Sequence, residues 1–158
     1  MKKIKIIRMF LLICIIAWAY IVFSFSSQDG NESSGLSRMV VDFFIKDPQI
    51  ADKVEPYVRK MAHFCEYALG GTLFLSLLYT YKITDEKKIA GAILLGIWYA
   101  IMDEIHQLMV PGRSGSIKDV YIDSLGIATG VIGMMIIIKI TIIIKEKNKS
   151  KKMIKSKN

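Results

Sequence analysis

The sequence predicts an all-α membrane protein with four transmembrane helices and a short amphipathic helix in the first loop outside the membrane. Hydrophobic residues make up 53% of the 158-residue chain, and its mean hydropathy is +0.38. This hydrophobic fraction is high for a soluble domain and favours a membrane protein. Four segments approach the roughly 20 apolar residues that a helix needs to cross a bilayer. Lys and Arg gather beside these segments, as they do in cytoplasmic flanks.

The first span is predicted at about residues 6–25, "IIRMFLLICIIAWAYIVFSF". A cleavable signal peptide is the alternative, because Ala17 and Ala19 form an A-x-A pattern behind a basic start. The apolar run continues past Ala19 through "YIVF". We therefore predict a retained transmembrane helix.

The segment 26–58 follows and reads as more than a linker. Within "LSRMVVDFFI", residues 36–45, the apolar residues recur at helical spacing. This pattern predicts a short amphipathic helix that lies on the outer surface or caps the bundle. Pro48 and Pro56 are expected to interrupt any continuous helix after it, because proline removes a helical hydrogen bond.

The other three spans are predicted at about residues 62–81, 89–109 and 120–144. The second span is polar at its start and the third is polar at its end. The last fourteen residues, 145–158, are rich in lysine and of low complexity. We predict a single membrane domain over 1–144 and a disordered tail over 145–158.

The distribution of Lys and Arg predicts the orientation. Basic residues crowd 2–8, the loop 82–88 and the tail 145–158, so these segments are expected on the cytoplasmic side together with both termini. The segment 26–60 and the turn near 111–116 are then outside. Nucleic-acid binding is not expected, because no folded basic surface accompanies the basic ends.

This topology brings the polar ends of three helices to one membrane depth. His63 and Glu66 are spaced i,i+3, and Asp119 and Asp123 are spaced i,i+4, so each pair projects from one helix face. A charge at the centre of a membrane helix costs roughly 2.5–3.5 kcal/mol. Charged side chains are therefore expected to pair with one another inside the bundle or to line a water-filled cleft. The candidate residues of one outward-facing cleft are His63, Glu66, Asp103, Glu104, Gln107, Arg113, Asp119 and Asp123, with His106 and Asp123 at its margin and Glu104 pointing partly elsewhere.

A structural explanation competes with the functional one. Buried polar groups can simply join membrane helices, although each such contact stabilises by less than about 1 kcal/mol on average. We favour a cleft because so many ionisable groups share one depth. Pro111 and Gly112 suit the centre of a tight turn that holds Arg113 over the cleft. The small residues Gly126, Gly130 and Gly133 are predicted to permit close helix packing.

Three segments resemble the VanZ-like family of bacterial membrane proteins. They are "FSFSSQ" at 23–28, "RKMAHFCEYALGG" at 59–71 and "AIMDEIHQLMVPGRSGSIKDVYIDSLG" at 100–126. The resemblance implies a polytopic protein of the bacterial cytoplasmic membrane, in a family named for a member that raises resistance to teicoplanin. The family motif usually has Asn where this chain has Asp123. If that position donates a hydrogen bond, Asp123 must be protonated or must pair with a cation.

Three functions remain open at this point. We favour a non-enzymatic envelope protein whose partners are membrane lipids and a lipid-linked cell-wall precursor or glycopeptide antibiotic. An enzyme acting on an envelope lipid is the second, with acid/base or metal-assisted chemistry at His63 with Glu66, or His106 with Asp103. A small ion- or proton-coupled transporter is the third. No cofactor or metal is expected, since the spacing of the ligand types is not diagnostic. The oligomeric state is left open.

Overall fold

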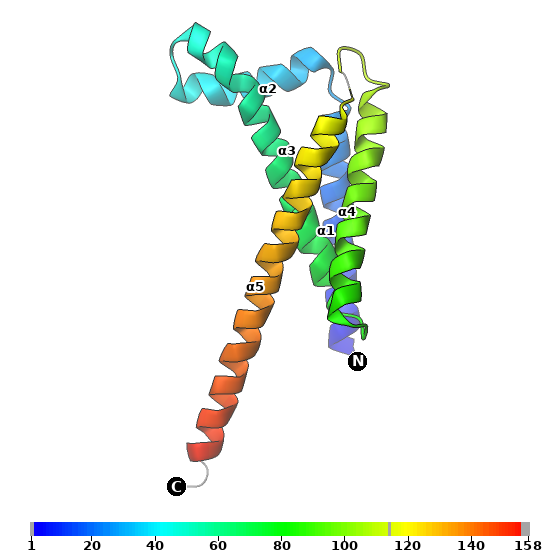
Figure 1. Cartoon of the computed structure of the whole chain (residues 1–158), viewed down its shortest axis with the longest axis vertical. Coiled ribbons are helices and arrows are strands. Elements are labelled where there is room, and N and C mark those ends of the chain that lie inside the picture. Colours follow the sequence, from blue (N-terminus) through cyan, green and yellow to red (C-terminus); the bar gives the residue numbers. More distant parts are fainter. Residues whose placement is uncertain (1, 114, 156–158) are drawn as a thin grey trace.

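The computed structural model describes residues 2–113 and 115–155, and within these ranges all regular structure is helical (Figure 1). Four helices are long and apolar enough to cross a membrane, the fourth of these over Ile117–Ser150. This confirms the predicted all-α, multi-pass architecture. The helices are α1 (Lys2–Ser26), α2 (Gly30–Phe44), α3 (Pro48–Leu78), α4 (Asp85–Gln107) and α5 (Ile117–Lys155).

Helix α3 is the centre of the bundle, because it packs along α5 and also contacts α1, α2 and α4. Its closest approach to α5 is made possible by glycine. A side-chain carbon at Gly130 would overlap the backbone of Ala68, and one at Gly126 would lie 2.5 Å from the carbonyl oxygen of Phe64. Gly133 has nothing near its missing side chain, so the predicted packing stripe ends at Gly130.

Trp18 packs helix α1 against α3. The indole N–H of Trp18 donates a 2.8 Å hydrogen bond to the backbone carbonyl of Glu66. The Trp18 ring packs edge-on against Tyr67 and Phe74 and covers Gly70, where a side chain would clash with it. The buried core that surrounds these rings extends to α4 and α5.

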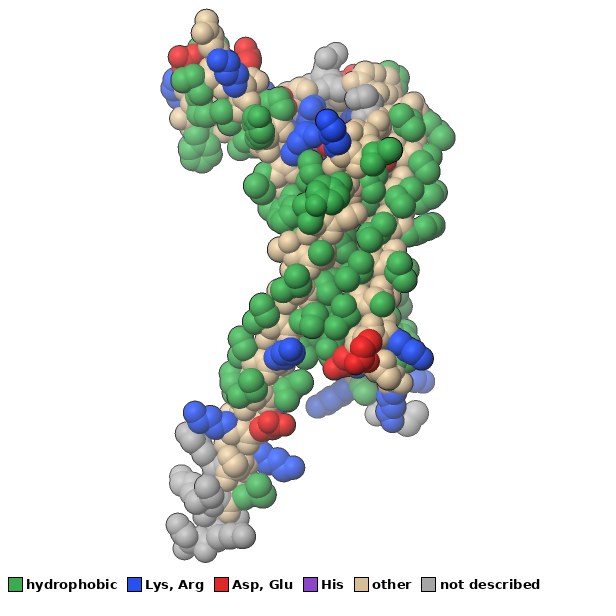
Figure 2. All heavy atoms as spheres, in the orientation of Figure 1, with side chains coloured by type: hydrophobic (Ala, Val, Ile, Leu, Met, Phe, Trp, Pro, Cys, Tyr) green, Lys and Arg blue, Asp and Glu red, His purple; other side chains and the backbone are tan. Residues whose placement is uncertain are grey.

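The surface of the bundle is apolar between two polar ends (Figure 2). Large hydrophobic side chains such as Phe10, Leu94 and Ile137 are more than half exposed. Charged side chains gather at the two ends of the molecule in this view. This distribution matches a hydrocarbon environment around the middle of the bundle and water at its ends.

Helix α2 confirms the predicted amphipathic helix between the first two spans. Together with the start of α3 it projects sideways at the end of the bundle opposite both chain termini (Figure 1). Arg38 on α2 forms ion pairs with Asp42 on the same helix and with Asp52 on α3. These contacts hold α2 against the beginning of α3.

Two sequence predictions about helix ends are corrected. Pro48 begins α3 at a position that needs no N–H bond, capped by the Asp47 carboxylate, and Pro56 lies inside the same helix. The helix continues because the carbonyl that Pro56 leaves unbonded belongs to Asp52, which is exposed and can bond water. The last span was predicted to end at residue 144, whereas α5 continues to Lys155, since Lys and Glu favour helix. Residues 156–158 lie outside the described ranges.

The side of the membrane occupied by each end stays a prediction from charge, which cysteine labelling can test. Cys14 and Cys65, both free, would first be replaced by alanine. A cysteine at the exposed position Gln49 is expected to react with an impermeant maleimide in intact cells. One at Lys147 is expected to react only after permeabilisation. The opposite pattern would invert the proposed orientation.

Candidate functional site

The link between α4 and α5 contains a tight turn that places Arg113. The backbone N–H of Arg113 donates to the carbonyl of Val110 at 3.2 Å, and Gly112 has a positive φ of 73°. Proline at the second position and a positive-φ glycine at the third are features of a type II turn. The sequence prediction of a turn centred on Pro111 and Gly112 is therefore confirmed.

Arg113 is held in place by the end of α1. Its Nε donates to the backbone carbonyl of Gln28 at 2.9 Å, and its Nη2 donates to that of Phe25 at 2.7 Å. Burial, together with the nearby positive charge of Arg59, lowers the pKa of the Arg113 guanidinium. Arginine still stays charged at neutral pH, so Arg59 and Arg113 are two neighbouring cations at this end of the bundle.

Glu104 joins α4 to the first turn of α5. The backbone N–H of Ser116 donates to Oε2 of Glu104 at 2.7 Å. Ser116 also caps α5, because its hydroxyl accepts from the N–H of Lys118 and its carbonyl accepts from that of Asp119. A carboxylate is stabilised beside the N-terminus of a helix. Glu104 is buried, and its carboxylate points toward the neighbouring helix α5.

Helix α3 supplies the facing wall. The Nζ of Lys60 lies 2.7 Å from Oδ1 of Asp119, which ties α3 to α5. One turn further along α3, Nδ1 of His63 lies 3.8 Å from Oε2 of Glu66. This His63 nitrogen is buried and has no hydrogen-bond partner among the residues that the structure describes. Such a group is available to a ligand or to water.

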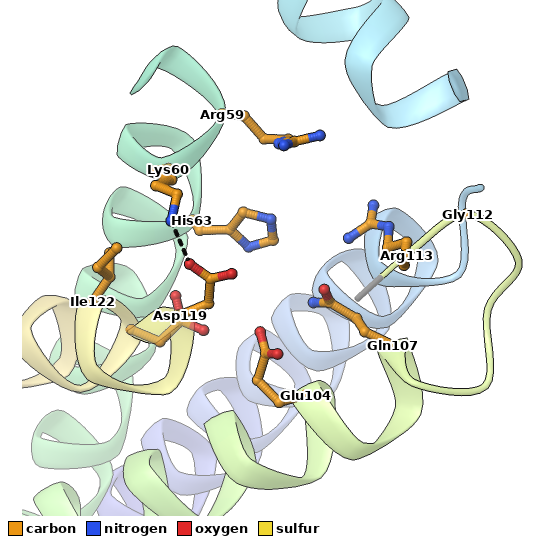
Figure 3. A pocket seen from close by; sticks show the side chains of 10 residues that line it. Arg59, Lys60, His63, Glu104, Gln107, Gly112, Arg113, Asp119 and Ile122 are labelled. Carbon is orange, nitrogen blue, oxygen red and sulfur yellow. Dashed lines mark hydrogen bonds and ion pairs between the residues drawn. The ribbon is translucent and has the colours of Figure 1, made fainter. Parts of the chain in front are cut away.

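These side chains surround a cavity of about 120 Å³, which we call the polar cleft (Figure 3). Arg59 and Arg113 both point toward the space beside His63, while Glu104 and Asp119 lie on its other side. The two arginines therefore lie on one side of the cleft, and the other side carries Glu104 and the Lys60–Asp119 ion pair. Its lining residues are Arg59, Lys60, His63, Glu104, Gln107, Gly112, Arg113, Asp119, Ile122 and Asp123.

The cleft includes most of the side chains that the sequence predicted and adds some that it did not select. Arg59, Lys60, Gly112 and Ile122 line the cleft but were not among the predicted cleft residues. The signal for the two cations was present, because they stand one turn before His63 on the same helix. Asp123, expected at the margin, lines the cleft and is only 2% exposed.

Three predicted residues lie outside the polar cleft. Asp103 is buried, does not line the cleft and accepts a 3.0 Å hydrogen bond from Nε2 of Gln107. Glu66 lines a neighbouring groove. His106 stacks on Phe23 and lies 3.1 Å from the Ser27 hydroxyl, so it packs against the end of α1.

The neighbouring cavity of about 280 Å³ lies between the end of α1, α2 and α3, and we call it the apolar groove. Leu36 and Val40 from α2 and Val58 and Ala62 from α3 line it, together with Phe25. Three side chains line both cavities: Arg59, His63 and Arg113.

No group of three or more His, Cys, Asp or Glu side chains in residues 2–113 and 115–155 is arranged to hold a metal ion. The cationic groups provide hydrogen-bond donors, and the buried Nδ1 of His63 donates or accepts according to its tautomer. Arginine and lysine in such an arrangement recognise phosphate or carboxylate oxygens. The chemistry that this geometry offers best is the binding of an oxyanion.

Comparison with known proteins gives one finding. The family model described as VanZ/LLP1 matches residues 10–139. No curated protein and no solved structure matches the chain. The matched range runs from α1 into α5 and includes every residue that lines the polar cleft and the apolar groove.

Proposed function

The chain belongs to the VanZ/LLP1 family, and from this membership we propose that it works in the bacterial cytoplasmic membrane by binding an anionic, lipid-linked headgroup in the polar cleft. In this role it is a binding protein and not an enzyme. It alters the access of other molecules to that headgroup at the outward-facing surface of the cytoplasmic membrane. The lipid-linked precursor of the cell wall is the ligand class that we favour.

One observation carries the proposal, namely that three cationic side chains line one small cavity at the end of the bundle. Lys60 is already paired with Asp119, but Arg59 and Arg113 approach each other without a carboxylate bonded to either guanidinium among the described residues. An anion between the two guanidinium groups would relieve their mutual repulsion. Arginine also presents a planar set of donors that matches phosphate oxygens.

The proposal predicts that the protein in nanodiscs of neutral lipid binds ethyl phosphate, a phosphate monoester with almost no chain. Arg59→Gln is expected to lower this affinity about tenfold, which corresponds to about 1.4 kcal/mol for a lost charge-assisted hydrogen bond. Isothermal titration calorimetry at low salt would measure it. Empty nanodiscs give the background.

Lys118→Gln is the matched control. It removes the same charge from the beginning of α5, but Lys118 is exposed and does not line the cleft. We expect a change of less than about twofold, because exposed charges are screened by water and salt. Equal losses in both variants, or no binding by the unmodified protein, would contradict the proposed site.

Teicoplanin susceptibility provides a second readout of the same proposal. If the cleft occupies or shields a cell-wall precursor, expression in a Gram-positive host should lower susceptibility to teicoplanin. His63→Ala, Glu104→Ala and Arg113→Ala should each remove this protection at equal membrane abundance. Protection that persists in all three variants would separate the phenotype from the cleft.

A further inference from the structure

The polar cleft and the apolar groove are adjacent parts of one site. Arg59, His63 and Arg113 form the boundary and line both cavities. On one side of this boundary the lining is charged, and on the other it is mainly aliphatic and aromatic. A single molecule that fills both cavities must therefore be amphiphilic.

The boundary is built to stay in place. Arg113 is bonded to two backbone carbonyls at the end of α1, as described above. Arg59 donates from Nη1 to the Ser34 hydroxyl on α2 at 3.1 Å. Arg113 thus links the end of α1 to the cleft, and Arg59 links α2 to it. Each guanidinium keeps at least one nitrogen that takes no part in these bonds. Arg59 lies on α3, which also lines the groove, and Arg113 reaches the groove from the link between α4 and α5.

The location of the groove favours a membrane lipid over a soluble ligand. Met39, Phe43 and Phe44 on α2 are 72%, 75% and 77% exposed, and they belong to the same amphipathic helix that lines the groove with Leu36 and Val40. Apolar side chains that are this exposed on an amphipathic helix are suited to the boundary between headgroups and acyl chains. The groove is therefore at the depth where a lipid chain begins.

Building on the proposed function, we infer that the apolar groove holds the first part of the hydrocarbon chain of a lipid whose phosphate lies between Arg59 and Arg113. The phosphate supplies a directly bonded anion, which neither guanidinium has among the described residues. The chain fills the space between Val40, Val58 and Ala62. With volumes of about 120 and 280 Å³, the two cavities together reach the size of a small-molecule site, whereas neither does alone.

A series of ethyl, butyl, hexyl and octyl phosphate, titrated into the protein in nanodiscs, tests this inference. Affinity should rise about fourfold for each methylene that the groove covers, beyond the rise seen with empty nanodiscs. Ala62→Trp fills the groove, so the gain in affinity with chain length should fall to the gain measured with empty nanodiscs. The affinity of this variant for ethyl phosphate should stay within about twofold of that of the unmodified protein. Ala17→Trp is the matched control, because it makes the same exchange at an exposed position on α1 away from the groove. It should change neither the chain-length dependence nor the affinity for ethyl phosphate.

The outcomes separate the two proposals. If ethyl phosphate binds but chain length has no effect beyond the empty nanodisc, the groove inference is overturned and the polar cleft stands. Absence of ethyl phosphate binding overturns the headgroup proposal itself. An octanoyl peptide without phosphate that binds as tightly as octyl phosphate, and equally well in Arg59→Gln, would assign the groove to an acylated peptide and overturn the lipid phosphate. Equal loss of affinity in Ala62→Trp and Ala17→Trp would show a general effect of the added ring and overturn the inference.

Discussion

Arg113→Ala is expected to lower the affinity for ethyl phosphate by about 30-fold or more, the largest loss among the cleft variants. The exchange removes a charged donor from the cleft, worth about 2 kcal/mol. It also frees the turn from Phe25 and Gln28, so the backbone around the cleft loses a support. Calorimetry in nanodiscs measures the affinity, and protease resistance of the folded protein checks that the bundle has formed.

Arg113→Lys separates charge from geometry. Lysine keeps the positive charge but has one nitrogen in place of three, so it cannot bond two carbonyls and a phosphate with a fixed planar group. We expect a loss of about tenfold, between the unmodified protein and Arg113→Ala. An affinity equal to that of the unmodified protein would mean that Arg113 contributes only its positive charge and not the planar geometry of its donors.

Gly130→Ala is expected to destabilise the bundle by about 2 kcal/mol or more, since overpacking a close contact forces the backbone to move. The added carbon would overlap the Ala68 backbone, in a region where the Thr72 hydroxyl lies 3.2 Å from the Gly130 carbonyl oxygen. Thermal unfolding in detergent would show a decrease of roughly 4–8 °C for a loss of this size. The measurement needs no ligand and is independent of function.

Gly133→Ala is the matched control on the same helix. Nothing lies within 4 Å of the added carbon, so the stability should not fall, and the higher helix propensity of alanine should raise it by up to about 1 kcal/mol. Similar melting temperatures for the two variants would mean that α3 and α5 are not in backbone contact at Gly130.

Much of the fold could be predicted because a bilayer restricts the choices. A spanning segment must satisfy its own backbone hydrogen bonds, so long apolar runs predict helices reliably. The start of α3 was missed because Pro56 was taken as a break, although a proline near an exposed carbonyl can remain within a helix. The end of α5 was missed because lysine-rich composition was given more weight than helix propensity.

The candidate site could be predicted by depth but not by the rotation of each helix. Helical spacing places Asp103 and Gln107 on one face, yet it does not say which face meets the cleft. The structure turns Glu104 and Gln107 toward the cavity and leaves Asp103 behind them, bonded to Gln107. The apolar groove was missed for another reason, since it depends on where α2 lies over α3 and no local pattern encodes that placement.

The contact between Arg113 and α1 has a consequence for how the site tolerates sequence change. Its two acceptors are main-chain oxygens, which every amino acid possesses. Exchanging the side chain of Phe25 or Gln28 therefore leaves both acceptors in the chain, and an alanine scan of this region would overlook them. An inserted or deleted residue between 25 and 28 would instead shift one carbonyl relative to the other. The two main-chain acceptors therefore depend on the length of this segment and not on its side chains.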